Sequence, residues 1–235
     1  MKLYSLAHSP YATRVRTLIA KAALDIEICH PEEALRTPEF VDHFPMGKIP
    51  VLELADGSQL PDSWVIMEYL NETACGGSNS PENPLERAQM QMFARYADTY
   101  LSPGGLFGLF KLVGQGGGAH SAEEELAALH AELARLERIL TVLPDFRERA
   151  IHLGDMALVP HMDFVLLLGP LFGEPAPLSK YPMSEGWFNW AKEDPAVAGS
   201  SSEMCDAVAK LFGSSSARAI SSTASLSIIS AGCAE

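Results

Sequence analysis

The pattern that most restricts the fold is a change in periodicity near residue 75. Before this point short β-like runs, among them KLYSL and PVLEL, alternate with helical segments, as is typical of an α/β unit. Beyond it every long segment has helical spacing, and one leucine-rich run begins with a capping-box pattern at Ser121 and Glu124. We therefore predict an α/β domain followed by an all-α domain.

A polar stretch, SNSPENP, lies between the two regions, and its two prolines in seven residues favour an irregular linker. The C-terminal end is rich in Ser and Ala, a composition typical of disorder, although its SLSIIS run is apolar enough to dock on a groove. We thus divide the chain into an N-terminal domain, a linker, a helical domain and a tail, with the ranges 1–77, 78–84, 85–212 and 213–235.

The charge balance disfavours some classes of partner. With 17 Lys and Arg residues against 30 Asp and Glu, the net charge is −13, which disfavours binding to nucleic acid or to an anionic membrane surface. The chain begins without a basic leader and apolar run, and no stretch approaches the ~18 apolar residues of a membrane span. The 47% of apolar residues can fill a core, so we expect a globular, cytoplasmic protein.

The four cysteines are far apart in the sequence and form neither a CxxC pair nor a Cys/His cluster. This spacing predicts no zinc site and no disulfide framework, so we expect reduced thiols and no bound metal. The four are Cys29, Cys75, Cys205 and Cys233.

The segment HSPYATRVR carries the first candidate for chemistry. Ser9 precedes Pro10, a residue well suited to the first helical position, so Ser9 is expected at a helix N-terminus. Cysteines in place of Ser9 and Ala12 would turn the stretch into CPYC, the dithiol that opens a helix in glutaredoxins. Because neither residue can form a mixed disulfide, thiol-disulfide exchange is disfavoured.

The segment GKIPVLELADGSQLPDS carries the second candidate. Pro50 stands between a loop and a strand, where a cis peptide bond would hold the backbone groups of the preceding residue outward. Asp56 and Gly57 predict a hairpin turn, and Asp62 with Ser63 predict the start of a helix. This segment therefore offers an unpaired backbone to which a peptide could bind.

At these residues the chain resembles a cytosolic glutathione transferase of the type that uses a serine, closest to zeta-like and bacterial members. The matching stretches are SPYATRVR, FPMGKIPVLE, PDSWVIMEYL and YPMSEGWFNWAKEDPAV. Their order and spacing carry the resemblance to about residue 199. It implies a thioredoxin-like N-terminal domain joined to an all-α domain, in agreement with the order of elements above.

The resemblance implies that glutathione binds as an extended tripeptide. The Ile49 backbone, before Pro50, would pair with the cysteinyl residue as an added strand, and Lys48 would meet the glycine carboxylate. The γ-glutamyl carboxylate would lie on the hydroxyl and N–H of Ser63, while Asp62 would accept from the ammonium group. The competing interpretations are an empty helix cap for Asp62 and Ser63 and a solvated surface charge for Lys48.

Ser9 is the candidate catalytic residue, because in the family such a serine donates to the glutathione sulfur. Lowering a thiol pKa from ~8.5 to about 6.5 requires about 2.7 kcal/mol of thiolate stabilisation, and a hydrogen bond to a charged group supplies roughly 1.5 to 3 kcal/mol. A Ser before Pro is also a common helix cap without a catalytic role. Tyr4, Ser5 and Tyr11 remain alternatives for the same task.

The electrophile pocket is expected beside Tyr11, with Phe107 and Phe110 from the second domain. The competing interpretations are that Tyr11 only covers the helix start and that the two Phe residues, at helical spacing, belong to the core. The resemblance implies a homodimeric detoxification enzyme. In such an enzyme glutathione serves as the cofactor, and its thiol attacks a small hydrophobic electrophile in a conjugation or an isomerisation. The alternative is a non-catalytic protein that binds glutathione and apolar ligands at the same sites.

One motif of the family is altered in the second domain. The usual Gly-Asp-x-x-Ser/Thr-x-x-Asp, which caps a buried helix, is replaced by GDMALVPHMDF, with Leu158 and His161 at the capping positions. We expect Pro160, in the first turn of that helix, to replace the cap.

Overall fold

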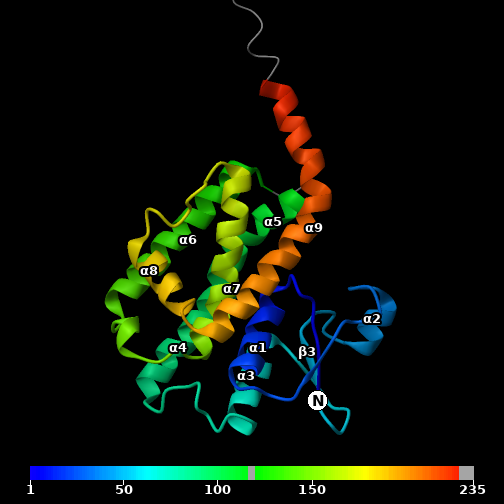
Figure 1. Cartoon of the computed structure of the whole chain (residues 1–235), viewed down its shortest axis with the longest axis vertical. Helices are drawn as coiled ribbons and strands as arrows, with labels where there is room; N and C mark the ends of the chain where they lie inside the picture. Colours follow the sequence, from blue (N-terminus) through cyan, green and yellow to red (C-terminus); the bar gives the residue numbers. More distant parts are fainter. Residues whose placement is uncertain (116–119, 228–235) are drawn as a thin grey trace, which may run out of the picture.

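The computed structural model describes residues 1–115 and 120–227, in two regions of different architecture (Figure 1). The N-terminal region is a four-stranded sheet, in the order β2-β1-β3-β4, with helices packed against it. Strand β1 is parallel to β2 and antiparallel to β3, which pairs antiparallel with β4, so the predicted α/β domain is confirmed. The elements are β1 (Lys2–Tyr4), α1 (Pro10–Lys21), β2 (Glu27–Cys29), α2 (Pro38–His43), β3 (Val51–Glu53), β4 (Gln59–Pro61) and α3 (Ser63–Thr73).

Local sequence explains where these elements begin and turn. Helix α1 starts after Ser9, whose Oγ accepts from the Ala12 N–H at 3.3 Å. The hairpin between β3 and β4 turns at Gly57, where a φ of +85° favours glycine. The Leu54 N–H donates to the Ser58 carbonyl at 2.8 Å and closes the turn, as the sequence predicts.

The second region is helical, as predicted (Figure 1). Ser121 and Glu124 form the expected capping box, with the Ser121 N–H donating to Glu124 Oε2 at 2.7 Å. The elements are α4 (Pro84–Tyr96), the π-helical segment η1 (Ala97–Leu106), α5 (Phe107–Gln115), α6 (Ala122–Val142), the 3₁₀ turn η2 (Phe146–Glu148), α7 (Leu153–Leu168), the 3₁₀ turn η3 (Gly169–Phe172), α8 (Pro182–Ala191) and α9 (Pro195–Ser227).

Helix α7 is the core helix of this region and contacts α1, α4, α9 and η1. All of its residues except Leu166 and Leu167 are buried. With the turn that follows, Leu153–Phe172 is the one described segment long and apolar enough to cross a membrane, and 72% of its apolar window is buried inside the protein. Asp155 and Asp163 interrupt this segment, so it is not a continuous apolar run, and its burial is typical of a core helix.

The start of α7 differs from the prediction. His152 precedes the helix, and its Nδ1 accepts from the Asp155 N–H at 3.2 Å, while the His152 N–H donates to Asp155 Oδ2 at 3.0 Å. Pro160 therefore lies in the helix interior and not in the first turn. The reason is that a reciprocal His-x-x-Asp cap, formed by His152 just before the altered motif and by Asp155 within it, already satisfies the first N–H groups.

Helix α9 continues through much of the predicted tail and ends at Ser227. Figure 1 shows its C-terminal end extending beyond the neighbouring helices. Ile228, Ile229 and Cys233 lie outside the described residues. Cys29, Cys75 and Cys205 are free thiols, and no metal-binding group of His, Cys, Asp and Glu occurs in the part of the chain that the structure describes.

Candidate functional site

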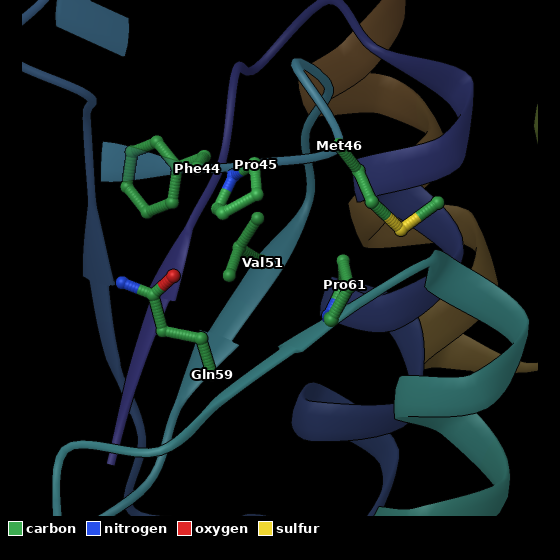
Figure 2. A pocket seen from close by; sticks show the side chains of 6 residues that line it. All are labelled: Phe44, Pro45, Met46, Val51, Gln59 and Pro61. Carbon is green, nitrogen blue, oxygen red and sulfur yellow. The ribbon is translucent and has the colours of Figure 1, made fainter. Parts of the chain in front are cut away.

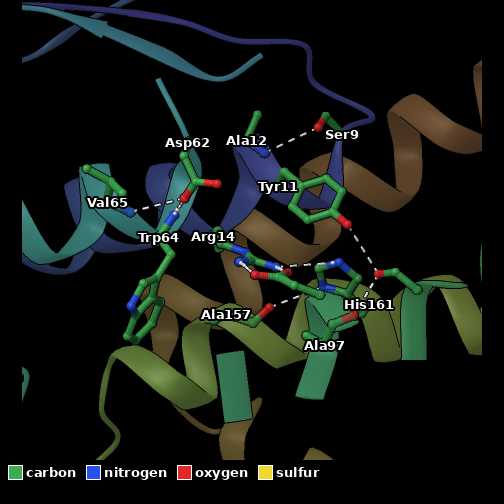
Figure 3. Close-up of polar contacts among 12 residues, drawn as sticks. Ser9, Tyr11, Ala12, Arg14, Asp62, Trp64, Val65, Ala97, Ala157 and His161 are labelled. Atoms are coloured by element: carbon green, nitrogen blue, oxygen red, sulfur yellow. Dashed lines mark hydrogen bonds and ion pairs between the residues drawn. The ribbon is translucent and has the colours of Figure 1, made fainter. Parts of the chain in front are cut away.

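The predicted site residues of the N-terminal region come from the starts of α1, β3 and α3. Figure 3 shows Ser9 at the start of α1 and Asp62 at the start of α3, on either side of the first turn of α1. The third segment contains Ile49 and Pro50, which are joined by the predicted cis peptide bond. Three separate segments thus present backbone or hydroxyl groups at the beginning of an element.

Ser9 is half-buried and caps α1. Its Oγ accepts from the Ala12 N–H, and its own hydroxyl hydrogen has no acceptor among the described residues. A hydroxyl at this position can therefore donate to a group placed at the helix N-terminus, where the helix dipole also favours negative charge.

Two of the alternative hydroxyls are already engaged. The Tyr4 O–H donates to Glu53 Oε2 at 3.2 Å, and burial together with the Glu53 charge raises the pKa of this phenol. Ser5 is 5% exposed, and its Oγ accepts from Arg16 Nη1 at 2.7 Å. Neither side chain is both accessible and free to donate.

Asp62 caps α3, and one of its two carboxylate oxygens is used in doing so. Oδ1 accepts from the Trp64 N–H at 2.9 Å and from the Val65 N–H at 3.2 Å (Figure 3). Oδ2 makes no hydrogen bond to a described residue. The next residue, Ser63, is 4% exposed, and its hydroxyl has no partner among the described residues. Asp62 therefore caps α3, and the cap leaves one carboxylate oxygen and the Ser63 hydroxyl without a partner among the described residues.

The segment before β3 has the features of a backbone-binding edge. The N–H and C=O of Ile49 make no hydrogen bond to other described residues. Lys48 is exposed and makes no ion pair within the described ranges. A cavity of about 190 Å³ lies beside this segment, with Met46 and Pro61 on one side and Phe44 and Gln59 on the other (Figure 2). None of the predicted site residues lines this cavity.

The three predicted pocket residues do lie together. The rings of Tyr11 and Phe107 are stacked with centroids 6.0 Å apart, and Phe107 meets Phe110 edge-on at 6.3 Å. Phe164 and Phe212, which sequence reasoning missed, extend the group, with centroids 5.5 and 5.7 Å from that of Phe110. We call these five residues the aromatic cluster. It joins α1, α5, α7 and α9, and no local signal in the sequence connects these helices.

A polar group behind Tyr11 was also missed. Arg14 is fully buried, and its Nη2 and Nη1 contact Asp98 Oδ1 and Oδ2 at 2.6 and 3.2 Å. Its guanidinium lies over the Tyr11 ring, 4.9 Å from the centroid. His161 Nε2 is 3.5 Å from Arg14 Nη2, and burial, followed by the Arg14 charge, lowers the pKa of His161 well below its ordinary value (Figure 3). His161 is therefore a neutral imidazole that donates from Nδ1 to the Ala157 carbonyl.

Known proteins with a similar sequence or fold include glutathione transferases and a related isomerase. Residues 8–73 match the family described as glutathione S-transferase, N-terminal domain. A probable glutathione S-transferase of rice is 31% identical over 59% of this chain, which spans only 58% of that relative. A maleylacetoacetate isomerase of Rhizobium meliloti is 31% identical over 59% of this chain and 67% of its own length.

A solved glutathione S-transferase of Methylobacillus flagellatus, with glutathione bound, has the same fold. The match has a TM-score of 0.70 at 24% identity and covers 85% of this chain and 98% of the other. The fold, the segment match and the isomerase relative lead to one assignment. The chain belongs to the cytosolic glutathione transferase family.

Proposed function

We propose that this chain catalyses the attack of the glutathione thiolate on a small hydrophobic electrophile, with Ser9 as the donor to the sulfur. The observation that carries the proposal is the state of the Ser9 hydroxyl, which is accessible and has no acceptor among the described residues. A charge-assisted hydrogen bond of roughly 1.5 to 3 kcal/mol, together with about 0.3 to 1 kcal/mol from a helix N-terminus, suffices to lower the thiol pKa to about 6.5.

The remaining groups fit the other parts of the tripeptide. The unpaired backbone of Ile49 is suited to the cysteinyl residue, because an extended peptide binds a free strand edge through main-chain hydrogen bonds. The free Ser63 hydroxyl and the second oxygen of Asp62 are suited to the γ-glutamyl carboxylate and ammonium groups. Lys48 supplies an unpaired cation for the glycine carboxylate.

The role of glutathione depends on the reaction. In a conjugation its sulfur forms a bond that remains in the product, so glutathione is a second substrate. In an isomerisation the same bond forms and then breaks, which returns glutathione unchanged, as for a cofactor. The relative named maleylacetoacetate isomerase supports the second reaction, and the relatives named transferase support the first.

The experiment is to replace Ser9 by Ala and measure the pKa of bound glutathione from its thiolate absorbance. We expect kcat/KM for a reactive electrophile to fall about 10- to 100-fold, with the glutathione Kd within a few-fold of its original value. Ser121→Ala is the matched control, because Ser121 is also a helix-capping serine but lies in the second domain. Full thiolate absorbance in Ser9→Ala would transfer the role to Tyr4, Ser5 or Tyr11.

A non-catalytic binding protein remains the second candidate, because the same groups would hold glutathione without turnover. A panel of electrophiles separates the two, since a binding protein would show glutathione affinity and no product with any of them. The homodimer is part of the proposal. Exposed apolar residues on α3, α4 and η1 support it, namely Val65 (47%), Leu85 (67%) and Tyr100 (47%), and sedimentation equilibrium tests it. The cytoplasmic location stays a prediction from the sequence.

A further inference from the structure

A hydroxyl of the second domain holds the ring of Tyr11. The Tyr11 O–H donates to Ser102 Oγ at 3.3 Å, and the Ser102 O–H donates to the Ala97 carbonyl at 2.7 Å (Figure 3). Ser102 has one hydroxyl hydrogen and gives it to Ala97, so its oxygen can only accept from Tyr11. Ser102 is 2% exposed, which keeps water from competing for this bond.

Ser102 reaches Tyr11 because η1 departs from regular α-helix. Pro103 lacks the N–H that an α-helix would use at this position, and Gly104 and Gly105 leave helical dihedral angles. Gly105 has a φ of +96°, and a Cβ there would lie 2.2 Å from the Glu125 carbonyl oxygen, so only glycine permits this approach to α6. Such π-helical turns are frequent at functional sites. The backbone therefore fixes where the Ser102 hydroxyl lies.

The bond to Ser102 is the only hydrogen bond of the Tyr11 hydroxyl within the described residues. The rest of the ring is held by packing: it stacks on Phe107 with an interplanar angle of 19° and meets His161 edge-on at 5.0 Å. Burial raises the pKa of the Tyr11 phenol, which therefore keeps its proton. Tyr11 follows Ser9 by two residues, so it is the member of the aromatic cluster that shares the start of α1 with the proposed donor to the sulfur.

We propose that Ser102 is a positioning residue that holds Tyr11 parallel to Phe107 and so selects flat aromatic electrophiles. This inference rests on the proposed function and deepens it by naming the substrate class. With the bond present, the Tyr11 ring keeps its fixed tilt on Phe107, and a planar electrophile stacks against the exposed part of this half-buried ring, next to the sulfur. Without the bond the Tyr11 ring loses its fixed tilt, and the preference for planar over branched electrophiles decreases.

Ser102→Ala and Tyr11→Phe remove the same bond from opposite ends. The affinities of S-(2,4-dinitrophenyl)glutathione, S-tert-butylglutathione and glutathione, measured by calorimetry, report on the pocket without turnover. We expect each variant to weaken the dinitrophenyl conjugate about 3- to 10-fold, with the other two ligands changed less than about twofold. The double variant should be no weaker than either single one, because the bond can be lost only once. In turnover, KM for a planar electrophile should rise while kcat stays nearly constant.

Thr17→Val is the matched control, because it removes a buried α1 hydroxyl that donates only to the Thr13 carbonyl. It should leave the affinity ratio of conjugate to glutathione unchanged. An unchanged ratio in Ser102→Ala and Tyr11→Phe, with glutathione still bound, would overturn this inference alone, as would additive losses in the double variant. Failure of the wild-type chain to bind glutathione would overturn the proposed function and this inference with it. If Ser102→Ala does not fold, Tyr11→Phe carries the test.

Discussion

Replacement of the buried carboxylate Asp155 by Asn should strongly destabilise the fold at neutral pH. Asp155 is 0% exposed, and its oxygens accept from Arg149 Nη1 and Nη2 at 2.6 and 2.9 Å and from Trp187 Nε1 at 2.9 Å. An amide of the same shape leaves the Arg149 guanidinium without its counter-charge. Breaking a buried ion pair from one side costs about 3 to 5 kcal/mol, which for a chain of this size lowers the Tm by roughly 6 to 20 °C.

The effect should depend on pH in a definite direction. Burial alone would raise the pKa of Asp155, but the adjacent His152 side chain and the hydrogen bonds and charge of Arg149 lower it below its ordinary value. A carboxyl group whose pKa is lower in the folded chain than in the unfolded chain stabilises the fold above the unfolded pKa, near ~3.9. That contribution is lost as the pH falls toward the folded pKa. The difference in the free energy of unfolding between wild type and Asp155→Asn should therefore be constant from pH 7 to about 5 and shrink below about 4.

Urea unfolding at a series of pH values from neutral to acid measures this difference. Asp145→Asn is the control, because Asp145 also caps a turn and contacts an arginine, Arg147 at 3.3 Å, but is 47% exposed. An exposed pair of this kind contributes less than about 1 kcal/mol, with little dependence on pH. The reasoning would be refuted if Asp155→Asn lost no more stability than Asp145→Asn, or if Asp155→Asn lost as much stability at acid pH as at neutral pH.

Two further predictions concern the ends of the site. Ser63→Ala removes the free hydroxyl at the start of α3, so KM for glutathione should rise about 10-fold or more while kcat changes little; a lower kcat with an unchanged calorimetric Kd would show that the γ-glutamyl group binds elsewhere. Truncation after Gly213 removes residues 214–235 and keeps Phe212 of the aromatic cluster; it should alter turnover of bulky electrophiles while leaving the Tm and glutathione affinity almost unchanged. Identical kinetics across electrophiles of increasing size would show that the tail has no part in the pocket.

Features set by a few neighbouring residues could be predicted from the sequence. The cap at Ser9, the start of α3 at Asp62 and the capping box at Ser121 each depend on a side chain that bonds a backbone N–H within three residues. The hairpin at Gly57 and the cis bond before Pro50 depend on the residue type at one position, a glycine and a proline. A local sequence contains the whole cause of such features, so the order of the elements followed from it.

Contacts between distant segments could not be predicted in the same way. Arg14 and Asp98 are separated by 84 residues, and Tyr11 and Ser102 by 91. Helical periodicity shows that a residue faces inward, but it does not show which residue of another helix it meets. The cap at His152 was missed for a different reason. The family resemblance directed attention to Leu158 and His161, whereas the functioning cap lies upstream of them.

Helix α1 lies in the N-terminal region but packs against both regions of the chain, and this explains why the candidate site depends on both regions. Nine of its 12 residues are buried. Val15 and Leu18 belong to the hydrophobic core, whereas Arg14 pairs with Asp98 of η1, and Lys21 pairs with Asp194, before α9, at 2.6 Å. In an isolated N-terminal domain Arg14 and Lys21 would face water. The start of α1, which Ser9 caps, would then lose its contacts with the helical region. The candidate site therefore depends on residues from both sides of the linker, because α1, which presents Ser9, packs against η1, α7 and α9 of the helical region.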